Sequence, residues 1–180
     1  MTFEKAFEKK YQQLLKDLTG ESDRAVVIIA AAYVDEIVGE MLQTVMVASP
    51  TASDNLFDGP NAPLSNLSNR IDFSFRLGLI SASASRSLHI LRRIRNSFAH
   101  NISGCSFAET NVANRVEELY KLHKIDQKHT DLQEIYGEST KAKFLMSITL
   151  LVGVLQEKQH SVKTIAQQGE EWPYQWLLGI

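Results

Sequence analysis

Apolar side chains recur at intervals of three and four residues along most of the chain, and this spacing predicts amphipathic helices. The predicted helices cover residues 3–18, 22–48, 64–79, 81 or 83 to 98, 106–122 and 139–159. Polar and apolar residues do not alternate over any segment long enough to predict a strand. We therefore predict an all-α fold, a compact single-domain bundle of about six to eight helices over residues 1–180.

The helix predicted over 22–48 is the most apolar part of the chain. Residues 25–34 are all apolar, and Asp35 and Glu36 end the run. A membrane span needs about twice that length. A helix that is apolar on every side is typical of a protein core, so we expect this helix at the centre of the bundle and no contact with a membrane.

Two segments interrupt the helical spacing. Residues 49–63 contain three prolines and a glycine, which predicts one long loop, and loops of that length are often functional. Leu56, Phe57 and Asp58 lie within it, and we predict that they are exposed and contact a partner. The tail over 170–180 is rich in tryptophan and leucine, so we expect it to dock on the body of the protein or on another subunit.

Composition adds little chemistry to this picture. The net charge is −2, which gives no overall attraction to nucleic acid or to an anionic membrane. The single cysteine, Cys105, excludes an internal disulfide and suits a reducing compartment. The first five residues, MTFEK, are polar and unlike a signal peptide, so we expect a cytoplasmic protein.

Residues 73–108 form an acid-free stretch that carries five arginines. Asp and Glu make up 21 of the 180 residues, so a window of this size would contain about four of them on average. The arginines are Arg76, Arg86, Arg92, Arg93 and Arg95. Such a stretch can bind phosphates or an acidic partner, and we predict that Arg86, Arg92 and Arg93 bind the partner. The alternative is that they pair with acids of neighbouring helices: Asp35, Glu36, Glu40, Glu117 and Glu118.

Gly78 lies in the segment 76–81, around which two predicted helices join, and could mark the turn of a DNA-binding helix-turn-helix motif. The second of these helices must bury its own apolar face, and the net charge is wrong for a stand-alone DNA-binding protein. Direct DNA binding is therefore only an alternative. The histidines lack the spacing of zinc ligands, and glycine-rich phosphate loops are missing, so we expect no metal and no cofactor.

The segment LRRIRNSFAH ends the fourth predicted helix. Its Arg95, Asn96 and His100 match Arg-polar-x-x-x-His and resemble the signature of the HEPN superfamily of helical domains. In active members, the resemblance implies that the arginine grips an RNA phosphate and that the histidine is the general acid or base, without a metal. The alternative role is structural: Arg95 pairs with Asp35 or Glu36. His100 then satisfies open carbonyls at the helix end. We expect the structural role and no enzymatic activity, with the ribonuclease as the alternative.

The chain also resembles the mannitol operon repressor family over about residues 20–160. The segments that carry the resemblance are DRAVVIIAAAYVDEIVGEML, LFDGPNAPLSNLSNRIDFSFRLGLIS and LRRIRNSFAH. The resemblance implies an all-helical cytoplasmic protein that represses the genes of mannitol use. Because the family is not known for a standard DNA-binding domain, it further implies an indirect mechanism through a transcription factor or a sugar-system protein. We expect a homodimer or a higher homo-oligomer.

Overall fold

The computed structural model describes residues 18, 20–49, 53–101, 104–124 and 137–165, and these form five helices. They are α2 (Asp23–Val45), α3 (Leu67–Arg76), α4 (Ala82–His100), α5 (Thr110–His123) and α8 (Thr140–Ser161). The described residues contain no strand, so the all-α prediction is confirmed. Five helices are fewer than the six to eight expected. The segments predicted over 3–18 and 170–180 fall almost entirely outside the described residues.

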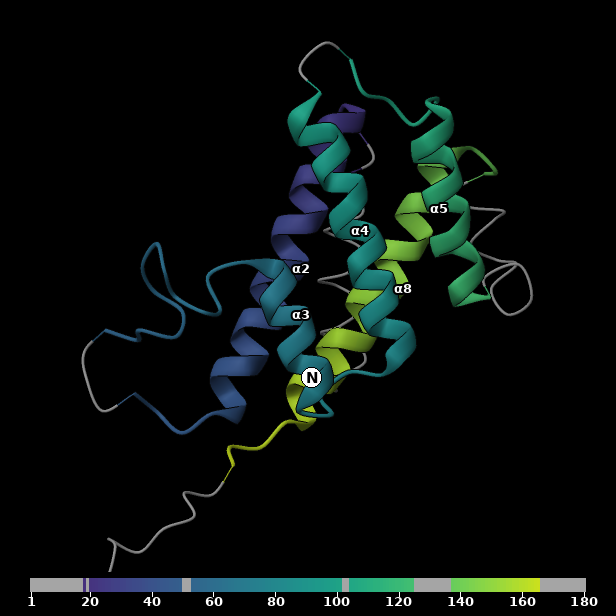
Figure 1. Ribbon diagram of the computed structural model, residues 1–180. Coiled ribbons are helices and arrows are strands. Elements are labelled where there is room, and N and C mark those ends of the chain that lie inside the picture. The colour runs from purple at the N-terminus through teal and green to yellow at the C-terminus, as the bar shows by residue number, and fades with distance from the viewer. Residues whose placement is uncertain (1–17, 19, 50–52, 102–103, 125–136, 166–180) are drawn as a thin grey trace, which may run out of the picture.

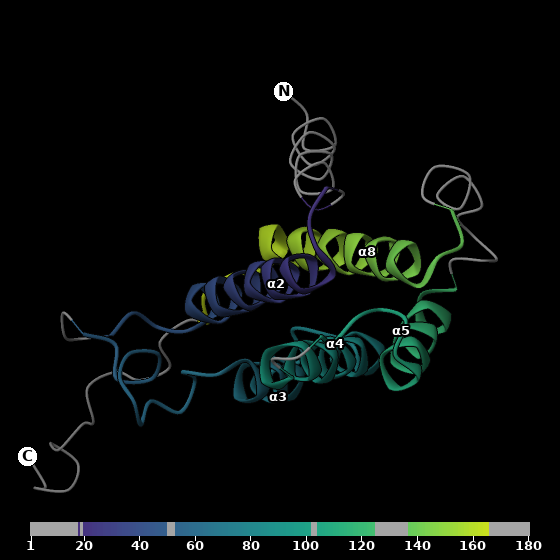
Figure 2. The same ribbon diagram turned by 90° about the horizontal axis from the view of Figure 1, so that it is seen from above.

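The helices form two layers. Seen from above, α2 and α8 lie side by side in one layer, and α3 and α4 lie side by side in the other (Figure 2). Helix α2 packs against α3, α4 and α8, while α5 bridges the layers by packing against both α4 and α8 (Figure 1). The α4 arginines therefore belong to the layer of α3 and α4, and not to the layer that contains α8.

Helix α2 buries eleven of its 23 residues and packs against three other helices, which supports the expected central position. It is not buried on every side, because Ile29, Ala32, Glu36, Glu40 and Gln43 form an exposed stripe along one face. The Ser22 hydroxyl caps its first turn by accepting a hydrogen bond from the Ala25 amide at 3.3 Å. The helix ends three residues earlier than expected, because the segment after α8 takes up its last carbonyls. The Thr164 hydroxyl donates to Thr44 O at 2.9 Å, and the next amide, of Ile165, donates to Val45 O at 2.8 Å.

None of the helices in the described ranges combines the length and the apolarity that crossing a bilayer would require.

Helix α3 is shorter than predicted. Gly78 ends it in the left-handed conformation (φ 69°), and its amide donates to Phe75 O while the Leu79 amide donates to Ser74 O, both at 2.9 Å. These two bonds form a Schellman motif, which needs a glycine at this position. The apolar spacing Leu64, Leu67, Ile71, Phe75 and Leu79 predicts the buried face of this helix. Within α3 only Ile71 and Ser74 are buried, and Phe75 is exposed, so the prediction is wrong for Phe75.

Serine side chains cap α4 and α8, and for α4 the cap is the first of the two serines, Ser81 and Ser83, at which the helix was expected to begin. Ser81 accepts from the Ala84 amide, and Ser139 accepts from the Ala142 amide, both at 3.1 Å. The sequence Ser106-Phe107-Ala108-Glu109 has the form of a capping box, which predicts that Ser106 caps a helix beginning there. This prediction is wrong, because α5 begins at Thr110 and its N-cap residue, Glu109, makes no side-chain cap bond.

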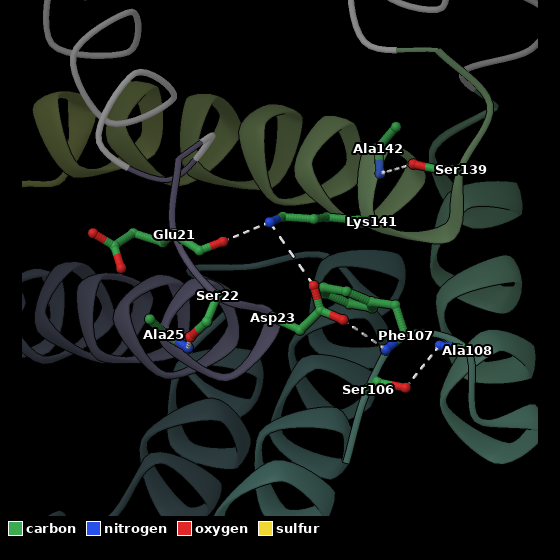
Figure 3. Close-up of polar contacts among 10 residues, drawn as sticks. All are labelled: Glu21, Ser22, Asp23, Ala25, Ser106, Phe107, Ala108, Ser139, Lys141 and Ala142. Atoms are coloured by element: carbon green, nitrogen blue, oxygen red, sulfur yellow. Dashed lines mark hydrogen bonds and ion pairs between the residues drawn. The ribbon is translucent and has the colours of Figure 1, made fainter. Parts of the chain in front are cut away.

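Asp23 explains the difference, because it draws the segment before α5 onto the start of α2. Its Oδ2 accepts from the Phe107 amide at 3.2 Å, and its Oδ1 lies 3.8 Å from the ammonium of Lys141 (Figure 3). The Phe107 ring then packs between Phe98 of α4 and Phe144 of α8, with centroids 5.5 and 5.2 Å away. One aspartate thus joins three parts of the chain.

Candidate functional site

The arginines of α4 border two cavities, one on each side of α3. The first, of about 400 Å³, is here called the α2–α4 cavity. Its lining consists of Ile28, Ala31, Ala32, Asp35, residues 65–68, Arg92, Arg95 and Asn96. The second, of about 620 Å³, is the α3–α4 cavity. Its lining consists of Ser68, Asp72, Phe75, Ala82, Ser85, Arg86, His89, Ile90, Arg92, Arg93 and Glu118. The sequence therefore predicted a real concentration of arginines, and Arg92 belongs to both cavities.

Arg70 of α3 holds the edge of the α2–α4 cavity together. Its Nη1 donates to Asp35 Oδ1 at 2.8 Å, and its Nε donates to Leu64 O at 2.7 Å. The guanidinium also lies 6.0 Å from the centroid of the Phe57 ring. It passes so close to Gly39 that a Cβ there would lie 3.1 Å from Nη1. No feature of the sequence marked this arginine, because it precedes the acid-free stretch over residues 73–108.

Arg95 does not pair with either acid proposed for it. Asp35 is bound by Arg70, and Glu36 is exposed without an ion pair to any described residue. The Arg95 guanidinium is itself exposed, and its Nη1 donates to the side-chain oxygen of the adjacent Asn96 at 3.2 Å. The predicted structural pairing is therefore wrong, and the charge of Arg95 faces the α2–α4 cavity without a carboxylate partner among the described residues.

Arg92 contributes a second cation without a carboxylate partner in the described ranges. Its side chain is half-buried, and its Nε is fully buried without an acceptor there. Most buried polar atoms in proteins have a hydrogen-bond partner. This unsatisfied Nε distinguishes Arg92 from the other arginines of α4.

The α3–α4 cavity is closer to electrical balance. Arg86 donates to Glu118 Oε1 through Nη2 at 2.7 Å and through Nε at 3.1 Å, which confirms for this arginine the alternative of pairing with a neighbouring helix. His89 Nε2 lies 3.1 Å from Asp72 Oδ1. Arg93 is exposed, and no described acid pairs with it.

His100 lies at the end of α4 and is exposed. It makes no hydrogen bond to a described residue, so the prediction that it satisfies the carbonyls at the helix end is wrong. The Asn101 amide instead donates to Ser97 O at 3.3 Å, and Arg24 donates to Asn101 O at 2.6 Å.

The predicted loop is present, but its two apolar residues differ. Leu56 is 45% exposed, as expected, whereas Phe57 is 6% exposed and belongs to the core, so the prediction that Phe57 is exposed is wrong. Asp58 is exposed, and its Oδ2 accepts from the Asp54 amide at 3.4 Å. These three residues line neither of the two cavities, so the structure does not bring them together with the α4 arginines.

The apolar face of α4 is buried, as expected for a helix of the core. Leu88, Leu91, Ile94 and Phe98 are all inaccessible to solvent. Among the described residues, no group of three or more His, Cys, Asp or Glu side chains is placed to hold a metal ion.

No protein-family model matches this sequence, and no curated protein does. A chain of similar fold occurs in a solved structure, the X-ray structure of the MtlR-HPr complex from Escherichia coli. The TM-score is 0.60 at 20% sequence identity, and the match covers 83% of this chain and 98% of that chain. The fold described here is therefore MtlR-like.

Proposed function

We propose that this chain regulates mannitol use by binding a sugar-system protein, and that it represses its target genes indirectly through such a partner. The observation that carries the proposal is the MtlR-like fold, matched over nearly the whole of a chain whose structure was solved as an MtlR-HPr complex. The segments that resemble the mannitol operon repressor family support the same function.

The environment of α4 supports an indirect mechanism. A recognition helix must expose one face to the bases of the major groove. The apolar face of α4 is buried, and Arg86 on another face is bound to Glu118. A protein partner that contacts the exposed polar groups requires no such helix.

The contacts that we propose for the partner lie at two separate places on the fold: the exposed loop residues Leu56 and Asp58, and Arg93 of α4. All three are exposed, and Arg93 has no carboxylate partner among the described residues. Phe57 is excluded from the contact because its ring is buried beside Arg70.

Titration calorimetry of the purified chain with HPr tests this proposal. We expect saturable binding, which Leu56→Ser and Arg93→Glu each weaken by about tenfold or more, since a lost anchor or a reversed charge at an interface commonly costs at least that much. Phe57 stays unchanged, so that lost binding cannot be attributed to a damaged core.

Matched controls come from exposed residues outside these two places. Leu77→Ser and Arg76→Glu make the same chemical changes on and just after α3. We expect each to leave the affinity within about twofold of wild type. No detectable binding of HPr, or a selective gel shift of operator DNA by this chain alone, would contradict the proposal.

Metal-independent RNA cleavage is a second proposal, since Arg95 and His100 are both exposed. Five residues separate them, which places them about 140° apart around a helix, so a shared phosphate requires a second copy of the chain. We would then expect RNA cleavage in the presence of a chelator that disappears in His100→Ala and persists in the control His160→Ala. Intact RNA after incubation with wild-type protein would end this proposal.

A further inference from the structure

The α2–α4 cavity carries an excess of positive charge. Arg92 and Arg95 are the cations of its lining, and Asp35 is its only acid. The Asp35 carboxylate is already bound at 2.8 Å by Arg70, which lies outside the lining. The two lining guanidinium groups are therefore not neutralised by the described residues.

Arg92 shows that an acceptor is missing at this place. Its Nε is buried and has no acceptor in the described part of the chain. Burying a guanidinium without an acceptor or a counter-charge costs free energy. Because Nε itself is inaccessible to solvent, an anionic ligand in the cavity would offset that cost through the charge of the guanidinium and not through a bond to Nε. A second guanidinium from the same helix, that of Arg95, lines the cavity beside it.

The start of α3 adds hydrogen-bond donors to the same lining. The Asn66 side chain caps the helix by accepting from the Asn69 amide at 3.0 Å. The amides of Leu67 and Ser68 lie in the first turn, where the helix offers them no acceptor and where its dipole favours an anion. Both residues line the cavity.

The rest of the lining suits hydroxyl groups rather than a second anion. The side chains of Ser65, Asn66, Ser68 and Asn96 are small, uncharged hydrogen-bonding groups. On the α2 side, the residues are Ile28, Ala31 and Ala32. A volume of about 400 Å³ lies within the range of small-molecule sites.

We infer that the α2–α4 cavity binds a small phosphate monoester that carries hydroxyl groups, with its phosphate between Arg92, Arg95 and the start of α3. Guanidinium binds phosphate through paired hydrogen bonds, and the uncharged side chains bind the hydroxyls. The inference does not depend on HPr binding, because none of the lining residues is among the residues proposed for the partner contact, Leu56, Asp58 and Arg93. Arg92 was predicted from the sequence to bind the partner but is not part of that proposal.

Titration calorimetry of the full chain tests it with a panel of probes: glycerol 3-phosphate, glucose 6-phosphate and mannitol 1-phosphate. We expect at least one ester to bind saturably, and its unphosphorylated counterpart and inorganic phosphate to bind at least tenfold more weakly. No binding of any ester at millimolar concentration would overturn the inference. Equal affinity for inorganic phosphate would overturn the assignment of a hydroxyl-bearing ligand.

Three substitutions on α4 locate the site. Arg95→Gln and Arg92→Gln should each weaken binding by about tenfold or more, because each removes a charge-assisted contact. The control Arg93→Gln removes the same charge at a position outside this cavity, and we expect a change within about twofold. Equal weakening by all three would indicate unspecific attraction and overturn the inference.

Arg95 is exposed, so Arg95→Gln is expected to fold even if Arg92→Gln does not. Arg93→Glu should weaken the binding of HPr but not that of the ester, and Arg95→Gln should weaken the binding of the ester. The two proposals can therefore fail separately. A single-stranded RNA that binds when none of the esters does would also overturn the inference, in favour of the RNA-binding alternative.

Discussion

Arg70 and Arg92 lie at the same junction of α2, α3 and α4, yet the fold uses them differently. Arg70 donates to the Asp35 carboxylate and to the Leu64 carbonyl, and it lies over the Phe57 ring. Arg92 borders both cavities and has a buried Nε without an acceptor among the described residues. One arginine holds loop and helices together, whereas the fold leaves the hydrogen-bonding capacity of the other unused.

The comparison teaches that an arginine-rich stretch says little about which arginine is structural. Arg70 is separated by 35 residues from the acid that it binds. The arginines singled out by composition include Arg86, which is paired, and Arg92, Arg93 and Arg95, which have no carboxylate partner among the described residues. Partners, and not local charge density, separate the two roles.

The largest expected effect is that of Arg70→Ala on stability. The substitution leaves the half-buried Asp35 carboxylate and the Leu64 carbonyl without their donor and removes the packing against Phe57. We expect the free energy of unfolding to fall by about 2 kcal/mol, since removing one partner of a partly buried pair leaves an uncompensated charge. Urea unfolding followed by circular dichroism measures this.

The matched control is Arg76→Ala, which truncates an exposed arginine of the same helix. Surface substitutions of this kind usually change stability by less than about 0.5 kcal/mol. If Arg70→Ala lowered the unfolding free energy no more than Arg76→Ala does, Arg70 would not be the residue that holds the loop and the helices together.

Local sequence predicted most of the fold. The helix segments between residues 22 and 161 were located to within a few residues, and Ser81, one of the two serines at which the fourth helix was expected to begin, caps α4. The failures are non-local. The cap expected at Ser106 is replaced because Asp23, 84 residues from Phe107, takes up the neighbouring amide. No spacing rule within a helix can anticipate that bond.

The candidate site was predicted only in part. The acid-free stretch correctly drew attention to Arg92 and Arg95, which line one cavity. Phe57 was misplaced because a Pro- and Gly-rich loop is normally exposed, whereas here the ring packs into the core beside Arg70. The hydrogen-bonding side chains of Asn66 and Ser68 gave no signal, since they gain a role only where α3 meets α4.

A pH titration of stability extends the comparison to His123, whose Nε2 is also buried without a hydrogen-bond partner among the described residues. Burial lowers the pKa of this imidazole below 6.5. The unfolded chain therefore takes up the proton first as the pH falls. Above about pH 6.5, His123 is neutral in the folded and the unfolded chain, so its titration does not lower stability. As the pH falls from there to the lower folded pKa, the unfolding free energy decreases by no more than about 1.4 kcal/mol per pH unit.

The variant His123→Leu should lose this part of the pH dependence. Unfolding free energies measured at intervals from about pH 8 to about pH 5 give the slope, and the difference at the higher pH reports packing alone. An unchanged slope would show that burial does not disfavour protonation of His123, and the lowered pKa would then be wrong.

Double-mutant cycles compare two arginine–carboxylate pairs of nearly equal length. The side chains of Arg70 and Asp35 are 18% and 33% exposed, and those of Arg86 and Glu118 are 63% and 41% exposed. We expect a coupling energy of about 0.5 kcal/mol or less for the exposed pair, because water and salt screen it, and a larger one for the first pair. Equal couplings would show that burial does not set the strength of these contacts.

The smallest expected effect is that of Arg92→Met on stability. Methionine keeps an apolar stem against the neighbouring helices and removes a guanidinium whose Nε makes no bond to the described residues. We expect the unfolding free energy to change by less than about 0.5 kcal/mol, in either direction. The same urea measurement, made beside Arg70→Ala, decides the comparison directly. A loss near that of Arg70→Ala would place Arg92 among the residues that hold the junction together, and its unsatisfied Nε would then no longer point to a missing ligand.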